Sequence, residues 1–267
     1  MKPQFHKPFC LLIIAIGLWL AGCHRYNEVY PVIRGCKIVK LKGGLNIGDS
    51  LVISYNQKGD PKSIIRGSVG TGAPNYFFGY DSKGRMTDFY GVYEAPNPYF
   101  EIWHRYHFDT KNRIITDTTY SFGYIGPGIP IPAPHEEELY VGNISTYAYD
   151  SRNRIIKSTD FYGQATLVTA YYTYNSAGNL EKIVRESNGT SATETFTYDN
   201  KANLRGTHPT WQFLDRDYSV NNSISVQSYN QYGLPVEADF SRHGYNGNFA
   251  TIPISATTIT YDCRHGH

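Results

Sequence analysis

The chain has 267 residues and carries 25 Lys and Arg residues against 23 Asp and Glu residues. So small an excess of positive charge excludes the strongly basic composition of nucleic-acid-binding domains, and we expect no nucleic-acid partner. Aromatic residues make up 15% of the chain and 24 of them are Tyr, a composition that favours β-sheet.

Residues 1–22 are predicted to be a signal peptide. Lys2 and Lys7 give a positive start, and an apolar run follows over residues 9–20. This run is shorter than the ~20 residues that a membrane-spanning helix needs, but it suits the apolar centre of a secretory signal. Removal of the segment takes away Lys2 and Lys7, which leaves equal numbers of basic and acidic residues.

The apolar run ends in Leu20-Ala21-Gly22-Cys23, which resembles a bacterial lipobox. The resemblance implies cleavage before Cys23 and acylation of its sulfur and amine; the alternative is an ordinary signal with a chance cysteine. Acyl chains, at ~0.8 kcal/mol per buried CH₂, would hold the protein on a membrane. We therefore expect a lipoprotein of the bacterial cell envelope, at the outer membrane, with residues 23–35 as the lipidated tether and first strand. Residues 24–28 are compatible with a periplasmic or a surface-facing position.

Two cysteines, Cys36 and Cys263, remain near the ends of the mature chain. An oxidising compartment permits a disulfide between them, and a bond that closes so long a loop could add about 5 kcal/mol of stability. The alternative is two unpaired, small apolar side chains.

Strands are predicted over residues 29–33, 36–41 and 51–55, and a recurring turn motif then dominates the chain. The motif is an aromatic residue, Asp or Asn, two variable residues, and then in most copies Gly or Asn. Eight copies occur, the sixth and eighth degenerate, at residues 55–59, 80–84, 108–112, 149–153, 174–178, 198–202, 229–233 and 261–265.

Each copy is predicted to form the corner of a β-hairpin. In seven copies a second apolar residue lies two positions before the motif aromatic, which places both on one face of a strand. Asp or Asn can accept backbone N–H groups within the turn, and Gly or Asn tolerates a left-handed backbone. The return strands are predicted to start at Pro61, Met86, Ile114, Ile155, Leu180, Leu204 and Pro235.

These hairpins predict one all-β domain over residues 36–267, with roughly 14–18 antiparallel strands in a long meander. Because strand twist makes wide sheets curl, we expect a strongly curved, rolled sheet or a barrel-like structure. No convincing helical periodicity follows the signal segment. Residues 126–138 contain four prolines and are predicted to form an extended loop, either a tolerated surface loop or a projection that binds a partner.

The repeated motif resembles the YD repeat of the RHS and teneurin family, and with the lipobox the chain resembles small YD-repeat lipoproteins of Gram-negative bacteria. The resemblance implies β-hairpins laid side by side, and it implies no catalytic residues and no cofactor. It is carried by Tyr80-Asp81-Ser82-Lys83-Gly84-Arg85-Met86, Phe108-Asp109-Thr110-Lys111-Asn112-Arg113-Ile114, Tyr149-Asp150-Ser151-Arg152-Asn153-Arg154-Ile155 and Tyr174-Asn175-Ser176-Ala177-Gly178-Asn179-Leu180.

Few residues point to metal or catalytic chemistry. His104 and His107 should lie on opposite faces of one strand and cannot share an ion. Cys263, His265 and His267 could lie on one face of an extended tail and bind zinc or copper, but tails fray and Cys263 has a competing partner. We therefore commit to no metal site and to no catalytic residue.

Aromatic residues are the remaining candidates for ligand contact. The motif aromatics are predicted to pack within the sheet, whereas off-motif aromatics could line a binding surface. These are Tyr99, Phe100, Trp103, Trp211 and Phe213. The leading expectation is a non-enzymatic envelope lipoprotein that binds a protein or a glycan; the alternatives are a polysaccharide hydrolase and a structural envelope component.

Overall fold

The computed structural model describes residues 33, 35–43, 49–93, 99–124, 141–162, 166–241 and 247–263. The described residues form an all-β fold with almost no helix. The strands are β1 (Cys36–Lys42), β2 (Ser50–Tyr55), β3 (Pro61–Arg66), β4 (Asn75–Tyr80), β5 (Met86–Val92), β6 (Tyr99–Phe108), β7 (Ile114–Tyr124), β8 (Val141–Tyr149), β9 (Ile155–Tyr162), β10 (Thr166–Tyr174), β11 (Leu180–Ser187), β12 (Thr190–Thr195), β13 (Ser225–Tyr229), β14 (Pro235–Asp239), β15 (Asn248–Phe249), β16 (Ile252–Pro253) and β17 (Ala256–Cys263).

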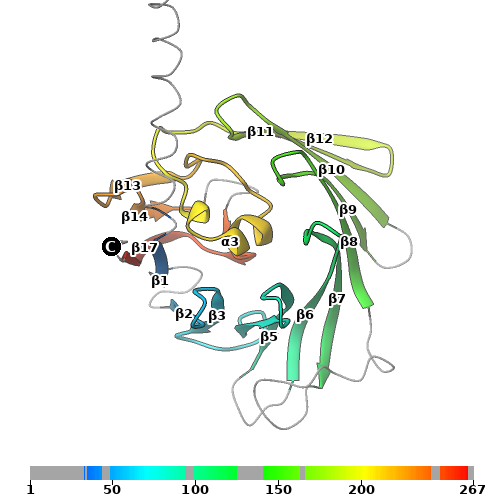
Figure 1. The fold of residues 1–267 in the computed structure, drawn as a ribbon, viewed down its shortest axis with the longest axis horizontal. Helices are drawn as coiled ribbons and strands as arrows, with labels where there is room; N and C mark the ends of the chain where they lie inside the picture. Colours follow the sequence, from blue (N-terminus) through cyan, green and yellow to red (C-terminus); the bar gives the residue numbers. More distant parts are fainter. Residues whose placement is uncertain are drawn as a thin grey trace, which may run out of the picture.

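One antiparallel sheet contains fifteen of these strands and confirms the predicted rolled meander. Strands β1 to β12 are neighbours in chain order, and the last strands return to the free side of β1 to give the order β12–β1, β17, β14, β13. Figure 1 shows the sheet as an arc whose concave side holds the chain segment that follows β12. The sheet is rolled but not closed, since β12 and β13 are its two edges.

Six copies of the turn motif form hairpin corners as predicted, and their return strands begin at Pro61, Met86, Ile114, Ile155, Leu180 and Pro235. The turn's fifth residue has a positive φ, for example +80° at Gly84 and +60° at Asn153. This backbone conformation explains the preference for Gly and Asn there. The register shifts beside each turn, as between Ala148 and Tyr149, whose partners are Lys157 and Ile155, so one residue of the return strand, here Ile156, bulges.

The motif tyrosines join consecutive hairpins through their hydroxyl groups. The Tyr149 hydroxyl donates to the carbonyl of Ile114 at 2.6 Å, and that of Tyr80 donates to Pro61 at 2.8 Å. In each case the acceptor is the first residue of the preceding return strand. Three further pairs follow the same geometry, Tyr174 with Ile155, Tyr198 with Leu180 and Tyr261 with Pro235, and Tyr55 donates to Ile38 within β1.

The sixth copy differs from the prediction because it forms no hairpin. Leu204 begins a 3-10 helix, η2 (Leu204–Thr207), instead of a return strand, because Asn203 caps that helix by accepting the N–H of Arg205. The copy still bridges the open side of the sheet. The Tyr198 hydroxyl reaches Leu180 on β11, and the Asp199 carboxylate accepts the hydroxyl of Tyr229 at the end of β13.

Residues 196–224 and 247–254 fill the hollow of the rolled sheet, with α3 (Pro209–Leu214) at its centre (Figure 1). Trp211 is fully buried and packs edge-on against Phe78, with ring centroids 5.9 Å apart. Phe249 packs against the same indole at 5.0 Å. The sheet therefore has its hydrophobic core on the inner face. Among the described residues, no helix is long and apolar enough to span a membrane.

A buried ion pair fixes this interior segment. The Arg205 guanidinium donates to Asp215 at 2.7 Å and lies 3.8 Å from Asp217. Burial raises the pKa of Asp215, although Arg205 and the N–H of Thr251 favour its carboxylate form. Removal of either partner would leave an uncompensated buried charge, which is strongly destabilising.

The hydroxyl bonds predict a measurable cost for Tyr149→Phe. The substitution keeps the ring but leaves the Ile114 carbonyl without its donor, so we expect the free energy of unfolding to fall by about 1 kcal/mol. Tyr171→Phe is the matched control, because Tyr171 is 40% exposed. Urea unfolding would measure both, and equal stability of the two variants would contradict the role assigned to the hydroxyl.

Burial also predicts a loss of stability at high pH. Desolvation raises the pKa values of the motif tyrosines, among them Tyr55, Tyr80, Tyr149 and Tyr174. These side chains ionise near pH 10 in the unfolded chain but stay protonated in the fold, so their contribution is complete below about pH 10 and lost above it. Urea unfolding can be measured from pH 8 to 11 together with phenolate absorbance. These two measurements should show that the tyrosines ionise only as the protein unfolds. If these tyrosines ionised completely and reversibly near pH 10 while the sheet stayed intact, the predicted link between their burial and stability would be wrong.

Candidate functional site

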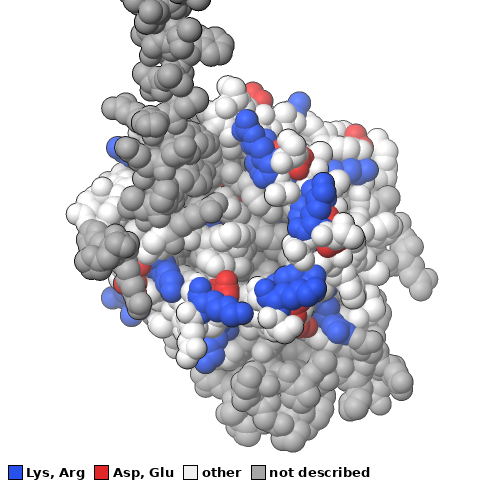
Figure 2. Space-filling model, in the orientation of Figure 1, with Lys and Arg blue, Asp and Glu red and all other residues white. Residues whose placement is uncertain are grey.

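The turn motifs lie together at one end of the rolled sheet. We call this end the turn rim; its described residues are 55–59, 80–85, 108–113, 149–154, 174–179, 198–202 and 229–233. Because every hairpin corner uses the same geometry, side chains at equivalent motif positions recur from one turn to the next. Figure 2 shows Lys and Arg side chains gathered along an arc at this end, several beside an acidic side chain.

Three arginines connect neighbouring turns of the rim. Arg85, Arg113 and Arg154 directly precede the return strands, and each pairs at 2.7 Å with the Asp of its own turn. Each guanidinium also lies over the motif aromatic of the next hairpin, at 4.6 Å for Phe108, 5.0 Å for Tyr149 and 4.1 Å for Tyr174. Such contacts contribute about 0.5–1 kcal/mol each at partly exposed sites.

Within each turn, the Asp is held as a carboxylate. The backbone N–H of Arg85 donates to Asp81 at 2.9 Å, and this bond, followed by the Arg85 side chain, lowers the pKa of Asp81. Asp109 has the same contacts with Arg113, and its pKa is lowered for the same reasons. The rim therefore presents its guanidinium groups in fixed positions at neutral pH.

A cleft opens between the turn rim and α3, with a volume of about 340 Å³. Its lining residues include Met86, Ile114 and Phe213, which we call its apolar floor, and the basic residues Arg85 and Arg113. An apolar floor beside fixed hydrogen-bond donors suits a ligand with one apolar face and polar edges. We call this feature the rim cleft.

Of the five predicted ligand-facing aromatics, Phe213 is the one that lines the rim cleft. It lies on α3 and packs edge-on against Tyr106 and Tyr147, with ring centroids 5.4 and 5.5 Å apart. Trp211, two residues earlier, is fully buried in the core. Trp211 thus cannot offer its ring to a ligand in this structure, which corrects the expectation. The reason is the short helix, whose alternate sides face the cleft and the core.

The other three predicted aromatics lie on β6, and two of them also depart from the expectation. Phe100 is fully buried and Trp103 is 4% exposed, whereas Tyr99 is 53% exposed. Trp103 stacks with Tyr120 at 5.0 Å and donates its indole N–H to Asp88. Phe100 and Trp103 are therefore packing residues, and Tyr99 lies at the end of β6 opposite the turn rim.

The cysteines divide between described and masked parts of the chain. The structure joins Cys36 and Cys263 by a disulfide between the first and last strands, across a sequence separation of 227. Cys23, the segment 1–22, the loop 126–138 and the tail histidines His265 and His267 lie outside the described residues. Within the described part of the chain, no group of three His, Cys, Asp or Glu side chains could hold a metal ion.

The inner face of the sheet carries acidic side chains that the sequence did not single out. Asp160 accepts both terminal nitrogens of Arg216 at 2.9 Å, and Asp117 contacts the His104 ring at 3.0 Å. Arg216 has a φ of +50° and also donates to Tyr147 at 3.1 Å. These contacts fasten the interior segment to β8 and β9. No sequence signal marked Arg216, because its partners are more than fifty residues away.

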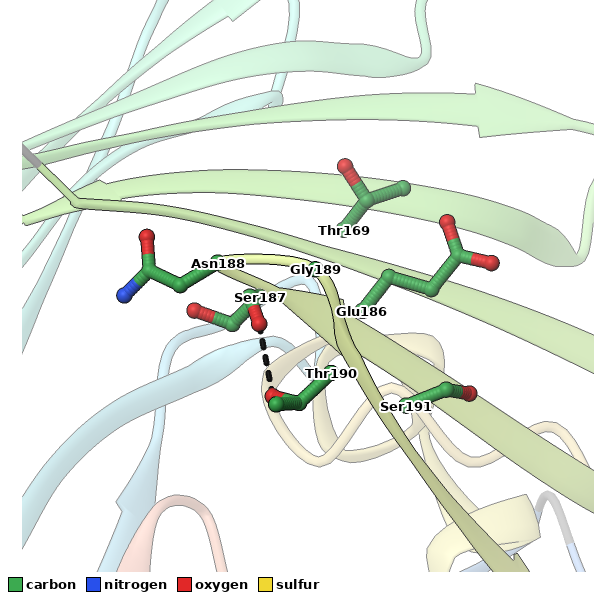
Figure 3. Close-up of a pocket in the computed structure, with 7 residues that line it drawn as sticks. All are labelled: Thr169, Glu186, Ser187, Asn188, Gly189, Thr190 and Ser191. Atoms are coloured by element: carbon green, nitrogen blue, oxygen red, sulfur yellow. Dashed lines mark hydrogen bonds between the residues drawn. The ribbon is translucent and has the colours of Figure 1, made fainter.

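A second, shallow depression lies at the hairpin between β11 and β12 (Figure 3). Its lining side chains are polar, and the Thr190 hydroxyl donates to the Ser187 carbonyl at 2.7 Å. The depression lacks both an apolar floor and a fixed guanidinium, so it offers a ligand less than the rim cleft does.

The comparisons with known proteins are limited to distant structural similarity. No protein-family model and no curated protein matches the chain. A crystal structure of TcdB2-TccC3-Cdc42 is similar at 17% identity and a TM-score of 0.32, over 74% of this chain and 10% of that one. A porin-like protein from Bacteroides uniformis is similar at 11% identity and a TM-score of 0.44, over 85% of this chain and 96% of that one. The chain thus spans about a tenth of the length of the first of these proteins.

Proposed function

We propose that this protein is a lipid-anchored, non-enzymatic binding protein of the bacterial cell envelope, built from YD-type repeats, that binds a protein or a glycan in the rim cleft. The observation that supports this most is the cleft itself. It combines an apolar floor at Phe213 with the guanidinium groups of Arg85 and Arg113, which ion pairs and ring contacts hold in place. Preorganised groups lose little conformational entropy when a ligand binds.

The composition of the rim cleft favours binding over hydrolysis. A glycosidase generally needs two carboxyl groups that flank the scissile bond. The described residues that line the cleft include neither Asp nor Glu. The acids of the inner sheet face are engaged elsewhere, Asp160 with Arg216 and Asp117 with His104.

The proposed lipid anchor would keep the rim cleft close to a membrane. Ile33 is buried and packs with Ala202 and Leu234, so the chain enters the fold beside the turn rim. Ile33 follows Cys23 by ten positions, and ten residues span at most about 35 Å. A ligand of the cleft would accordingly be met near the membrane surface.

The anchor predicts a change of location for Cys23→Ser. Serine cannot accept the thioether-linked lipid, so we expect the variant to leave the membrane fraction and appear in the soluble fraction of the producing cells. Immunoblots of the two fractions would measure this, with Cys10→Ser as the control. Retention of the Cys23→Ser variant on the membrane would refute the lipid anchor.

The cleft predicts that binding depends on the Phe213 ring. A glycan array and a pull-down with the full chain in detergent would supply the ligand. Phe213→Leu keeps the apolar volume but removes the ring, so we expect about a tenfold loss of affinity for that ligand. Tyr99→Leu makes a comparable change at the opposite end of β6 and should leave affinity unchanged. Equal affinities for both variants would place the binding surface elsewhere.

A further inference from the structure

A row of basic side chains crosses the turn rim at one motif position. The third residue after the motif aromatic is basic and exposed in the four consecutive hairpins from β2–β3 to β8–β9. These residues, which we call the basic row, are Lys58, Lys83, Lys111 and Arg152. Lys201 holds the same position in the sixth copy and is also exposed.

The backbone fixes where each of these residues lies. The N–H groups of Lys58, Lys83, Lys111 and Arg152 each donate at 2.9 Å to the Asp or Asn side chain that opens the turn. The long side chains can change conformation, but the same hydrogen bond holds the Cα atom at an equivalent position in each turn. The row is therefore periodic because the turns are.

The spacing of the row follows from the sheet. Successive turns are two strands apart, and at about 4.8 Å per strand this places one cation roughly every 10 Å. Contacts between adjacent turns agree with this close spacing, because a Cβ atom built on Gly84 would lie 3.6 Å from Nζ of Lys58 in the preceding turn. The Arg85 side chain likewise reaches Asn112 of the next turn at 3.3 Å.

The charges of Lys83, Lys111 and Arg152 are not cancelled within their own turns. Asp81, Asp109 and Asp150 are already paired with Arg85, Arg113 and Arg154. Among the described residues, no ion pair joins an acid to the four basic side chains of the row. Each of the three turns from β4–β5 to β8–β9 therefore has one basic residue more than it has acids, whereas Asp60 and Asp199 offset the formal charges of Lys58 and Lys201.

We propose that the basic row binds an acidic linear polysaccharide with one carboxylate or sulfate per disaccharide, laid across the turns. This inference rests on the proposed binding function and narrows its ligand class. An extended β-linked disaccharide is close in length to the two-strand repeat, so successive acidic groups meet successive turns. Nucleic acids fit less well, because DNA phosphates follow one another about every 3.4 Å along a strand. The apolar floor of the rim cleft, beside Arg85 and Arg113, can receive the flat face of a sugar ring.

Binding of hyaluronan oligosaccharides by the full chain in detergent tests the proposal, since that polymer carries one carboxylate per disaccharide. Calorimetry should show affinity that falls as salt rises from 50 to 300 mM, because these contacts are exposed and screened. Lys83→Gln with Lys111→Gln should weaken binding about tenfold. Lys40→Gln with Lys157→Gln removes two exposed charges from outside the row and should leave the affinity unchanged.

The remaining outcomes separate this inference from the proposed function. The proposed match between the charges of the polysaccharide and the basic row would be overturned if dextran or single-stranded DNA bound as tightly as hyaluronan or more tightly. It would also be overturned if the two double variants lost equal affinity for hyaluronan. A protein ligand that depends on Phe213, together with no hyaluronan binding, would overturn the basic row as a polysaccharide site and leave the proposed function standing. Failure of both hyaluronan and every ligand in the array and pull-down would overturn both.

Discussion

The hydrogen bond from a motif tyrosine to the preceding hairpin is the contact on which the rest of the structure depends. Each hydroxyl joins two corners that the strand ladder alone leaves at the end of the sheet, as Tyr80 does with Pro61. The arginine stacks add a second contact between the same neighbours, as Arg113 does with Tyr149. The edge strands β12 and β13 do not pair, but hydroxyl bonds also cross this gap. Tyr198 donates to Leu180 on β11, and Tyr229 donates to Asp199. The turn rim thus forms a continuous ring, although the sheet is open.

The ring and the interior segment support one another. The segment after β12 crosses the rim through Asp199 and then turns inward to bury Trp211 and Arg205. Its burial supplies the inner face of the sheet with a hydrophobic core, which a rolled single sheet otherwise lacks. Arg216 then reaches Asp160 on β9 and fastens the interior to the sheet wall. Phe213 of α3 is half-buried and lines the rim cleft together with Met86 and Ile114 of the sheet.

Much of the sheet could be predicted from the sequence because each hairpin is specified locally. Asp or Asn with Gly or Asn defines the corner, and residues such as Met86 and Ile155 were correctly predicted to begin return strands. The interior could not be predicted in this way. Helix α3 has six residues, which are too few to show a repeating helical pattern of apolar residues in the sequence. Pro209 after the capping residue His208 is nevertheless a signal for the start of a helix. The ladder of hydroxyl bonds had one trace in the sequence: seven of eight motif aromatics are Tyr rather than Phe.

The candidate site shows a similar division between local and long-range information. The basic row follows from a basic residue at one motif position, but the near balance of 25 basic and 23 acidic residues over the whole chain conceals it until the turns lie side by side. Phe100, Trp103 and Trp211 could not be told from Phe213, because burial depends on partners far along the chain. Hydrogen exchange of Tyr198→Phe against the unchanged protein tests the ring most directly. The account predicts faster exchange in β11, β12 and the 230–233 turn, with β2 to β5 unaffected. Unchanged exchange throughout, or a uniform increase, would show that the ring does not close the open side of the sheet.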